Sequence, residues 1–141
     1  MVLNDVFMAA AIGWLFSQAI KFVLNLIRGR DRKFWNFMWA SGFPSTHSAL
    51  TISTSVYVGL KFGTAHPLFG LTLILTFIVI YDRIKINQVY AVIRSVYPDL
   101  NERAREKGID LEETFGHRLI EVAAGILVGI LAGLVSHALM G

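Results

Sequence analysis

The sequence predicts an all-α integral membrane protein, a helical bundle of about four transmembrane helices. Of its 141 residues, 55% are hydrophobic and only 16% are charged, and the mean hydropathy is +0.57. Soluble domains seldom carry so little charge. The apolar residues also form long runs, as helices need in order to cross a hydrocarbon core about 30 Å thick. No linker divides the chain, so we expect one membrane domain over residues 1–141.

Four segments are predicted to span the membrane: about 6–27, 44–60, 65–86 and 117–140. The apolar centre of the third, residues 68–81, is short for a span, so a re-entrant or buried segment is the alternative. Isoleucines and valines recur at helical spacing beyond it, which predicts a helix that projects from the membrane to about Tyr97. Pro98 should end that helix. Residues 98–116 are expected to form a charged cytoplasmic loop.

The distribution of Lys and Arg predicts an orientation. Four lie just after the first span and one lies after the second. Seven lie beyond the third apolar run, the last of them Arg118 at the start of the last span, and none lies in the C-terminal tail. Cytoplasmic segments carry the excess of Lys and Arg. We therefore expect both termini outside the cell (plasma) membrane and the first and third loops in the cytoplasm.

The second half of the first span carries a polar stripe. Its members follow one another at steps of three, four and three residues, which puts them on one helical face: Gln18, Lys21, Asn25 and Arg28. A charged side chain inside a span is costly unless it faces the protein interior or reaches out to the interface. A side chain that extends to the interface would explain the position of Lys21, but not the positions of all four residues. We therefore expect the stripe to face the interior.

The run SGFPSTHSAL, residues 41–50, combines the features of a phosphate site at a helix N-terminus. Ser41 or Ser45 can cap the helix, and Pro44 suits its first turn. The unpaired N–H groups and positive dipole of such a terminus favour a phosphate. His47 can give or take a proton near neutral pH. The alternative is an ordinary capped helix start with a polar histidine packed beside it.

His117 and Glu121 are four residues apart at the start of the last span and share a face. A carboxylate bonded to one imidazole nitrogen fixes the tautomer and raises the basicity of the other nitrogen, which suits a nucleophile. His47 could then protonate a leaving alkoxide, while basic residues neutralise the phosphoryl oxygens. A structural His117–Glu121 pair is the alternative. Metal binding by two histidines and carboxylates is a further option, which the surrounding Lys and Arg disfavour.

Residues 41–49 resemble the second signature of the type 2 phosphatidic acid phosphatase superfamily. They are especially similar to its small divergent branch, the acid phosphatase/vanadium-dependent haloperoxidase-related membrane proteins, or divergent PAP2 family. Residues 116–122 are similar to the final motif of this branch, and Lys21 and Arg28 match the spacing of the first signature of the superfamily. Gln18 and residues 81–82 also fit the branch.

The resemblance implies a PAP2-like core and a phosphohistidine mechanism that needs no metal or cofactor. His117 would be the nucleophile, Glu121 would replace the usual aspartate, and His47 would be the general acid. The phosphate would be held by Lys21, Arg28, the amides around Ser45 and Thr46, and the neighbouring Asp82 and Arg83.

The sequence also departs from the superfamily pattern. The arginine usual six residues before the nucleophilic histidine is replaced by Leu111, and Arg83 and Arg118 are candidates for the missing charge. The expected function is a phosphatase acting on a lipid-linked phosphate: phosphatidate, phosphatidylglycerol phosphate, or a polyprenyl phosphate or diphosphate. A non-catalytic binder or carrier of anionic lipid phosphates is the alternative.

The last span carries a ridge of small residues, Gly125, Gly129 and Gly133, that lets another helix approach closely. This ridge can pack within the bundle or form a homodimer. The expected partners are the bilayer and a lipid-linked phosphate. Nucleic acid is not expected, because no basic run with interleaved aromatics is present.

Overall fold

The computed structural model describes residues 4–27, 42–108, 111 and 119–141. These residues form helices, and none of them lies in a strand. The helices are α1 (Asp5–Ile27), α3 (Thr46–Phe62), α4 (Pro67–Val96), α5 (Leu100–Glu106) and α7 (Leu119–Met140). The prediction of an all-α membrane protein is confirmed.

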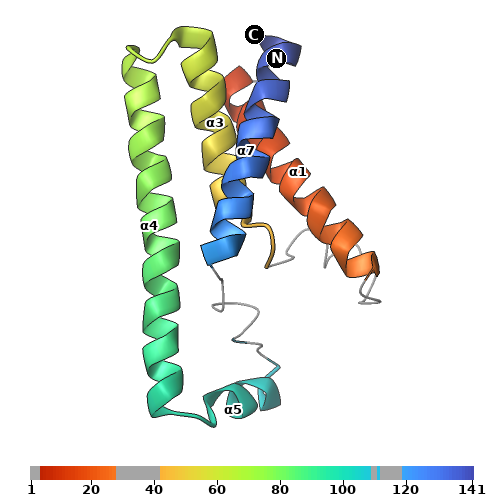
Figure 1. The fold of residues 1–141 in the computed structure, drawn as a ribbon, viewed down its shortest axis with the longest axis vertical. Helices are drawn as coiled ribbons and strands as arrows, with labels where there is room; N and C mark the ends of the chain where they lie inside the picture. The colour runs from red at the N-terminus through yellow and green to blue at the C-terminus, as the bar shows by residue number, and fades with distance from the viewer. Residues whose placement is uncertain (1–3, 28–41, 109–110, 112–118) are drawn as a thin grey trace.

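Helix α3 is the centre of the bundle (Figure 1). It packs against α1, α4 and α7, and α1 and α7 also touch each other. Helix α4 packs mainly on α3 and lies at the edge of the bundle. The two chain ends lie together at one end of the molecule, while α5 lies at the other.

Three of the described helices, α1, α4 and α7, are long and apolar enough to cross a membrane. Helix α3 has only 17 residues and is rich in hydroxyl groups, because its place is the interior of the bundle. Its serine hydroxyl groups donate hydrogen bonds to backbone carbonyls: Ser53 Oγ donates to Ala9 O at 2.7 Å, and Ser55 Oγ donates to Thr51 O at 3.0 Å. A helix rich in hydroxyl groups is stable there because these hydrogen bonds keep the groups from being left unpaired in lipid.

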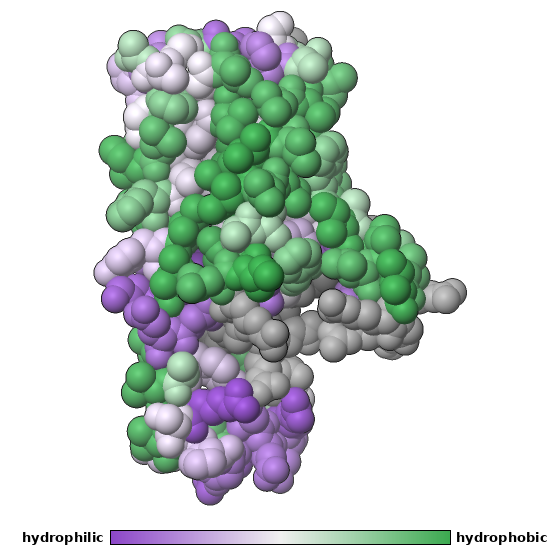
Figure 2. Space-filling view, viewed as in Figure 1, coloured by the Kyte–Doolittle hydropathy of each residue, from purple (hydrophilic) through white to green (hydrophobic). Residues whose placement is uncertain are grey.

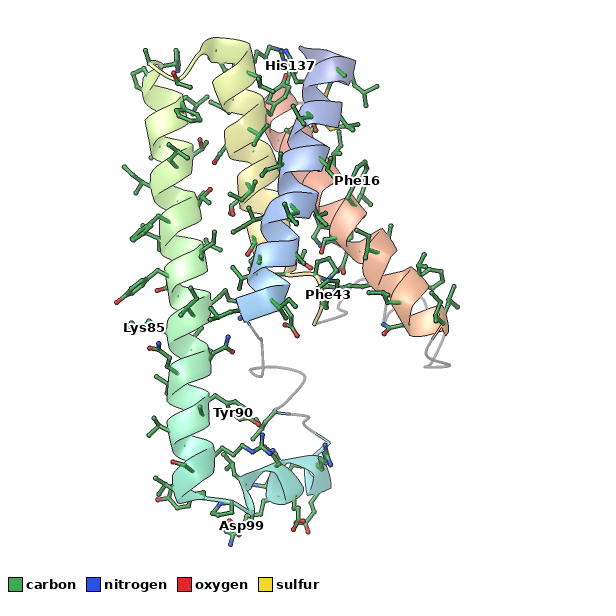
Figure 3. All side chains as sticks on the ribbon, viewed as in Figure 1. Phe16, Phe43, Lys85, Tyr90, Asp99 and His137 are labelled. Carbon is green, nitrogen blue, oxygen red and sulfur yellow. The ribbon has the colours of Figure 1, made fainter. Side chains whose placement is uncertain are left out.

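The short apolar run at 68–81 is the middle of one continuous helix of 30 residues. This helix extends to Val96 and ends at Tyr97, as the helical spacing predicted. At 1.5 Å per residue it is about 45 Å long, which exceeds a hydrocarbon core of about 30 Å. It is therefore long enough to extend beyond the hydrocarbon core towards α5, where Tyr90 donates to Asn101 Oδ1 at 2.8 Å (Figure 3). Helix α5 lies in the segment that the sequence predicted only as a loop.

The molecular surface agrees with a bilayer environment. Figure 2 shows apolar side chains over the part of the molecule where α1, α3 and α7 lie, and hydrophilic ones gathered towards α5. Many large side chains of the three long helices are exposed, among them Phe7 on α1, Phe77 on α4 and Leu139 on α7. In water this exposure would be costly, but lipid chains cover such side chains at no cost.

The glycine ridge on α7 packs against α3 of the same chain. A Cβ atom at Gly129 would lie 2.7 Å from Ala49 O, and one at Gly133 would lie 2.6 Å from Val56 Cβ. Gly13 on α1 meets α3 in the same way, 2.7 Å from Ala49 O. The ridge is therefore used within the bundle. A homodimer through Gly125, Gly129 and Gly133 stays a prediction.

At the end where the chain termini meet, Lys61 joins three helices. Its Nζ atom donates to Asp5 Oδ2 on α1 at 2.6 Å, to Tyr57 OH at 2.9 Å and to Met140 O on α7 at 3.0 Å. His137 packs edge-on against the Tyr57 ring at the same end (Figure 3). This cluster holds α1, α3 and α7 together at one end of the bundle. The candidate functional site lies at the other end.

We predict that Gly129→Ala destabilises the bundle by about 1–3 kcal/mol, because the added methyl meets a backbone carbonyl that cannot rotate away. Thermal unfolding of the detergent-purified protein measures the loss. Gly70→Ala on α4 is the matched control, since no atom lies within 4 Å of a Cβ there. Equal melting temperatures for the two variants would contradict the packing described here.

Candidate functional site

The N-terminus of α3 is built by Ser45. Its backbone is extended (φ −66°, ψ 116°), and its Oγ atom accepts a hydrogen bond from the Ser48 N–H at 3.4 Å. The sequence offered Ser41 and Ser45 as possible N-caps. Ser45 is the N-cap in the structure, and Ser41 lies outside the described residues. Pro44 precedes the cap, so it does not occupy the first helical turn as the sequence suggested. Gly42 has φ +100°, a backbone conformation that favours glycine.

The amides at this terminus are not equivalent. The Ser45 N–H donates to Glu121 O on α7 at 2.9 Å, which ties the start of α3 to the start of α7. This amide is already engaged and does not suit a phosphate. The Thr46 and His47 N–H groups lie in the first turn, where an α-helix supplies no acceptor. They are the amides that a bound anion would meet.

Helix α1 brings a lysine to the same place. Lys21 is only 4% exposed, and its Nζ atom donates to Thr46 Oγ1 at 2.5 Å. Gln18, one turn away, is 2% exposed. The inward direction predicted for the stripe is confirmed for these two side chains. Asn25 is half-buried, and Arg28 lies outside the described residues.

Ser17 belongs to the site, although its sequence pattern did not single it out. It is fully buried, its Oγ lies 3.1 Å from Thr46 Oγ1, and it donates to Pro44 O at 3.4 Å. Ser17 therefore positions the Thr46 hydroxyl group, which accepts the hydrogen bond from Lys21. The available signal was its four-residue spacing from Lys21, which places a small hydroxyl on the same helical face.

Helices α4 and α7 complete the cluster with opposite charges. Glu121, in the first turn of α7, lies within electrostatic range of both Lys21 and Arg83 and attracts them. Arg83 and Lys21 both lie within electrostatic range of His47, whose side chain is exposed at the start of α3. Arg83, one of the two arginines proposed to replace the one missing at Leu111, lies at this cluster. The other, Arg118, lies outside the described residues.

The structure does not place the remaining predicted residues in the cluster. Asp82 is exposed on α4, and within the described ranges no hydrogen bond or ion pair joins it to the cluster. His117 and Arg118, like Arg28, lie outside the described residues, so their roles stay predictions. In the part of the chain that the structure describes, no three His, Asp or Glu side chains gather as metal ligands would.

One end of the bundle presents several charged and hydrogen-bonding groups to a ligand. Four helices contribute to one end of the bundle: α1 gives an ammonium group, α3 two first-turn amides and an imidazole, α4 a guanidinium and α7 a carboxylate. Two cations and a helix N-terminus beside a single carboxylate favour an anionic ligand.

The chain is similar to known proteins over most of its length. The chain is similar to the "uncharacterized membrane protein YuiD" of Bacillus subtilis (strain 168), with 31% identity over 137 residues that cover 86% of each chain. No solved structure matches it. The sequence pattern of the divergent PAP2 family matches residues 2–132. Since that match covers nearly the whole chain, the protein belongs to the divergent PAP2 family.

Proposed function

We propose that this protein is a membrane-embedded lipid phosphate phosphatase that works through a phosphohistidine at the cytoplasmic face. The observation that carries the proposal is the bond between the buried Lys21 ammonium group and Thr46 at the N-terminus of α3. A lysine buried at mid-helix in a membrane protein is costly, and such residues mark functional sites by default. Here it lies beside the amides that suit a phosphate.

The phosphate group would be held from several sides. The Thr46 and His47 amides would donate to one oxygen, and Lys21 would exchange its bond to Thr46 for a charge-assisted bond to the phosphate. Arg83 would approach from α4, and we assign Arg28 to the same oxygens from its spacing of seven residues from Lys21 in the sequence. The acyl or prenyl chain would stay in the bilayer beside the apolar surface of the helices.

The chemistry would proceed in two displacements. The imidazole of His117 attacks the phosphorus, the bond from phosphorus to the lipid oxygen breaks, and His47 gives its proton to that oxygen as it leaves. His47 then takes a proton from a water that attacks the phosphohistidine, which releases inorganic phosphate and restores His117. The cations and amides stabilise the charge on the phosphoryl oxygens in both steps.

Glu121 is proposed to orient His117. The two are four residues apart, and the Glu121 backbone is anchored to the Ser45 amide at 2.9 Å. The start of α7 is thereby fixed to the phosphate-binding terminus of α3. A carboxylate held there can accept the N–H of His117 and stabilise the positive charge that this imidazole carries while phosphorylated.

The second candidate is a binder or carrier of lipid phosphates without turnover. Its specific support is Leu111, which stands where the superfamily has a phosphate-binding arginine. The approach of Arg83 to His47 and Lys21 favours catalysis instead, because it returns a guanidinium to the site.

The direct test is phosphate release by the detergent-purified protein from phosphatidate, phosphatidylglycerol phosphate and polyprenyl phosphates, with EDTA present. We predict that His117→Ala and His47→Ala each abolish release. His66→Ala is the control, because His66 caps α4 at the opposite end of the bundle and should keep full activity. Full activity in both site variants would refute the mechanism. Lipid binding without release by the wild type would favour the carrier.

The two lysines at opposite ends of the bundle should separate function from stability. Lys21→Met should lower phosphate release about 10²- to 10³-fold but preserve thermal stability, because it removes a costly buried charge. Lys61→Met should do the reverse, since it breaks bonds to Asp5, Tyr57 and Met140 O. Melting temperatures and release rates of both variants decide this. Parallel losses in the two would show that Lys21 is structural.

The orientation is tested by single cysteines, since the chain has none of its own. We predict that Thr64→Cys, in the turn between α3 and α4, reacts with a membrane-impermeant maleimide in intact cells. Ser95→Cys, near the far end of α4, should react only after lysis. The opposite pattern would place the site at the outer face of the membrane.

A further inference from the structure

We propose that Thr76 is the positioning residue that sets Arg83 in the phosphate site. This inference rests on the proposed function only for the identity of the ligand. It concerns the one helix of the site, α4, that lies at the edge of the bundle and packs mainly on α3.

Thr76 forms the polar link between α4 and α3. It is 5% exposed, its Oγ1 atom donates to Thr51 O at 3.2 Å, and it lies 3.0 Å from Ser55 Oγ. Thr51 Oγ1 in turn donates to His47 O at 2.9 Å. Thr76 is therefore joined through two hydrogen bonds to the turn of α3 that carries His47.

Arg83 follows Thr76 by seven residues, about two helical turns, and so lies on the same face of α4. It is half-buried, whereas the preceding Tyr81 and Asp82 are exposed. Because a helix is stiff over two turns, a rotation or sliding of α4 at Thr76 would move the Arg83 guanidinium out of the site. The hydrogen bonds of Thr76 therefore hold the part of α4 that carries Arg83 in its position beside α3.

Apolar packing alone does not fix this helix. Another close contact of α4 is Phe69, whose ring would lie 2.8 Å from a Cβ atom at Gly59, and Leu68 packs beside it against the core. A ring against a flat glycine surface tolerates sliding, and between helices in lipid no hydrophobic force opposes it. Hydrogen bonds are directional, so those of Thr76 fix the rotation and the register of α4 on α3, which the Phe69 contact does not fix.

The first arm of the test measures the position of α4 without any ligand. Spin labels on the cysteine-free chain at Val23→Cys (51% exposed) on α1 and at Gln88→Cys on α4 report the distance between the two helices. Thr76→Val should shift or broaden that distance distribution. Thr72→Val is the matched control, because Thr72 is equally buried but bonds only to Phe69 O in its own helix. An unchanged distribution in Thr76→Val would overturn the proposal.

The second arm couples Thr76 to Arg83. Binding of soluble dihexanoyl phosphatidate is measured for the His117→Ala protein, so that turnover does not interfere, and for the same protein with Thr76→Val, Arg83→Met or both. Thr76→Val alone should weaken binding about threefold, the effect of a typical interhelical hydrogen bond. In the Arg83→Met background it should have no further effect. Fully additive losses would overturn the positioning role.

The two arms also separate this inference from the proposed function. If the parent protein binds no phosphatidate, the proposed function fails, and the spin-label distances alone decide whether Thr76 places α4. A moved α4 with unweakened phosphatidate binding would overturn the proposal, because Arg83 would then not depend on Thr76.

Discussion

The close approach of α1 and α7 to α3 is the constraint on which the site depends. Gly13 and Gly129 bring both neighbours against the same carbonyl, Ala49 O, with 2.7 Å between it and a Cβ built at either glycine. At this separation Lys21 can reach Thr46, and the Glu121 carbonyl can accept the Ser45 amide. Larger side chains at the glycines would push the helices apart and open both contacts.

The polarity of α3 follows from the same constraint. A helix surrounded by α1, α4 and α7 meets protein rather than lipid, so it can carry serines and threonines whose hydroxyls bond to carbonyls. Its first turn ends inside this shell, at the level of Lys21. The opposite end of α3 is held by Lys61 and Asp5, so stability and the proposed ligand binding fall to different ends of one helix.

Much of this arrangement can be predicted from the sequence, because membrane helices are signalled by length, hydropathy and periodicity. The extent of α4 to Tyr97 and the inward direction of Gln18 and Lys21 follow from spacing alone. The partner of the glycine ridge does not, because small residues indicate a close approach without saying which helix approaches. Two further features cannot be predicted from the spacing of residues: the role of Ser17, and the hydrogen bond from the Ser45 amide to Glu121 O. Both depend on tertiary contacts.

The central claim is that an anion binds at the first turn of α3 beside Lys21. Amide NMR of the isotopically labelled protein during titration with inorganic phosphate tests it most directly. We predict that the Thr46 and His47 signals shift, while the Ser45 signal moves little because its N–H is already bonded to Glu121 O. Shifts confined to the Lys61 end, or none at Thr46 and His47, would contradict the account.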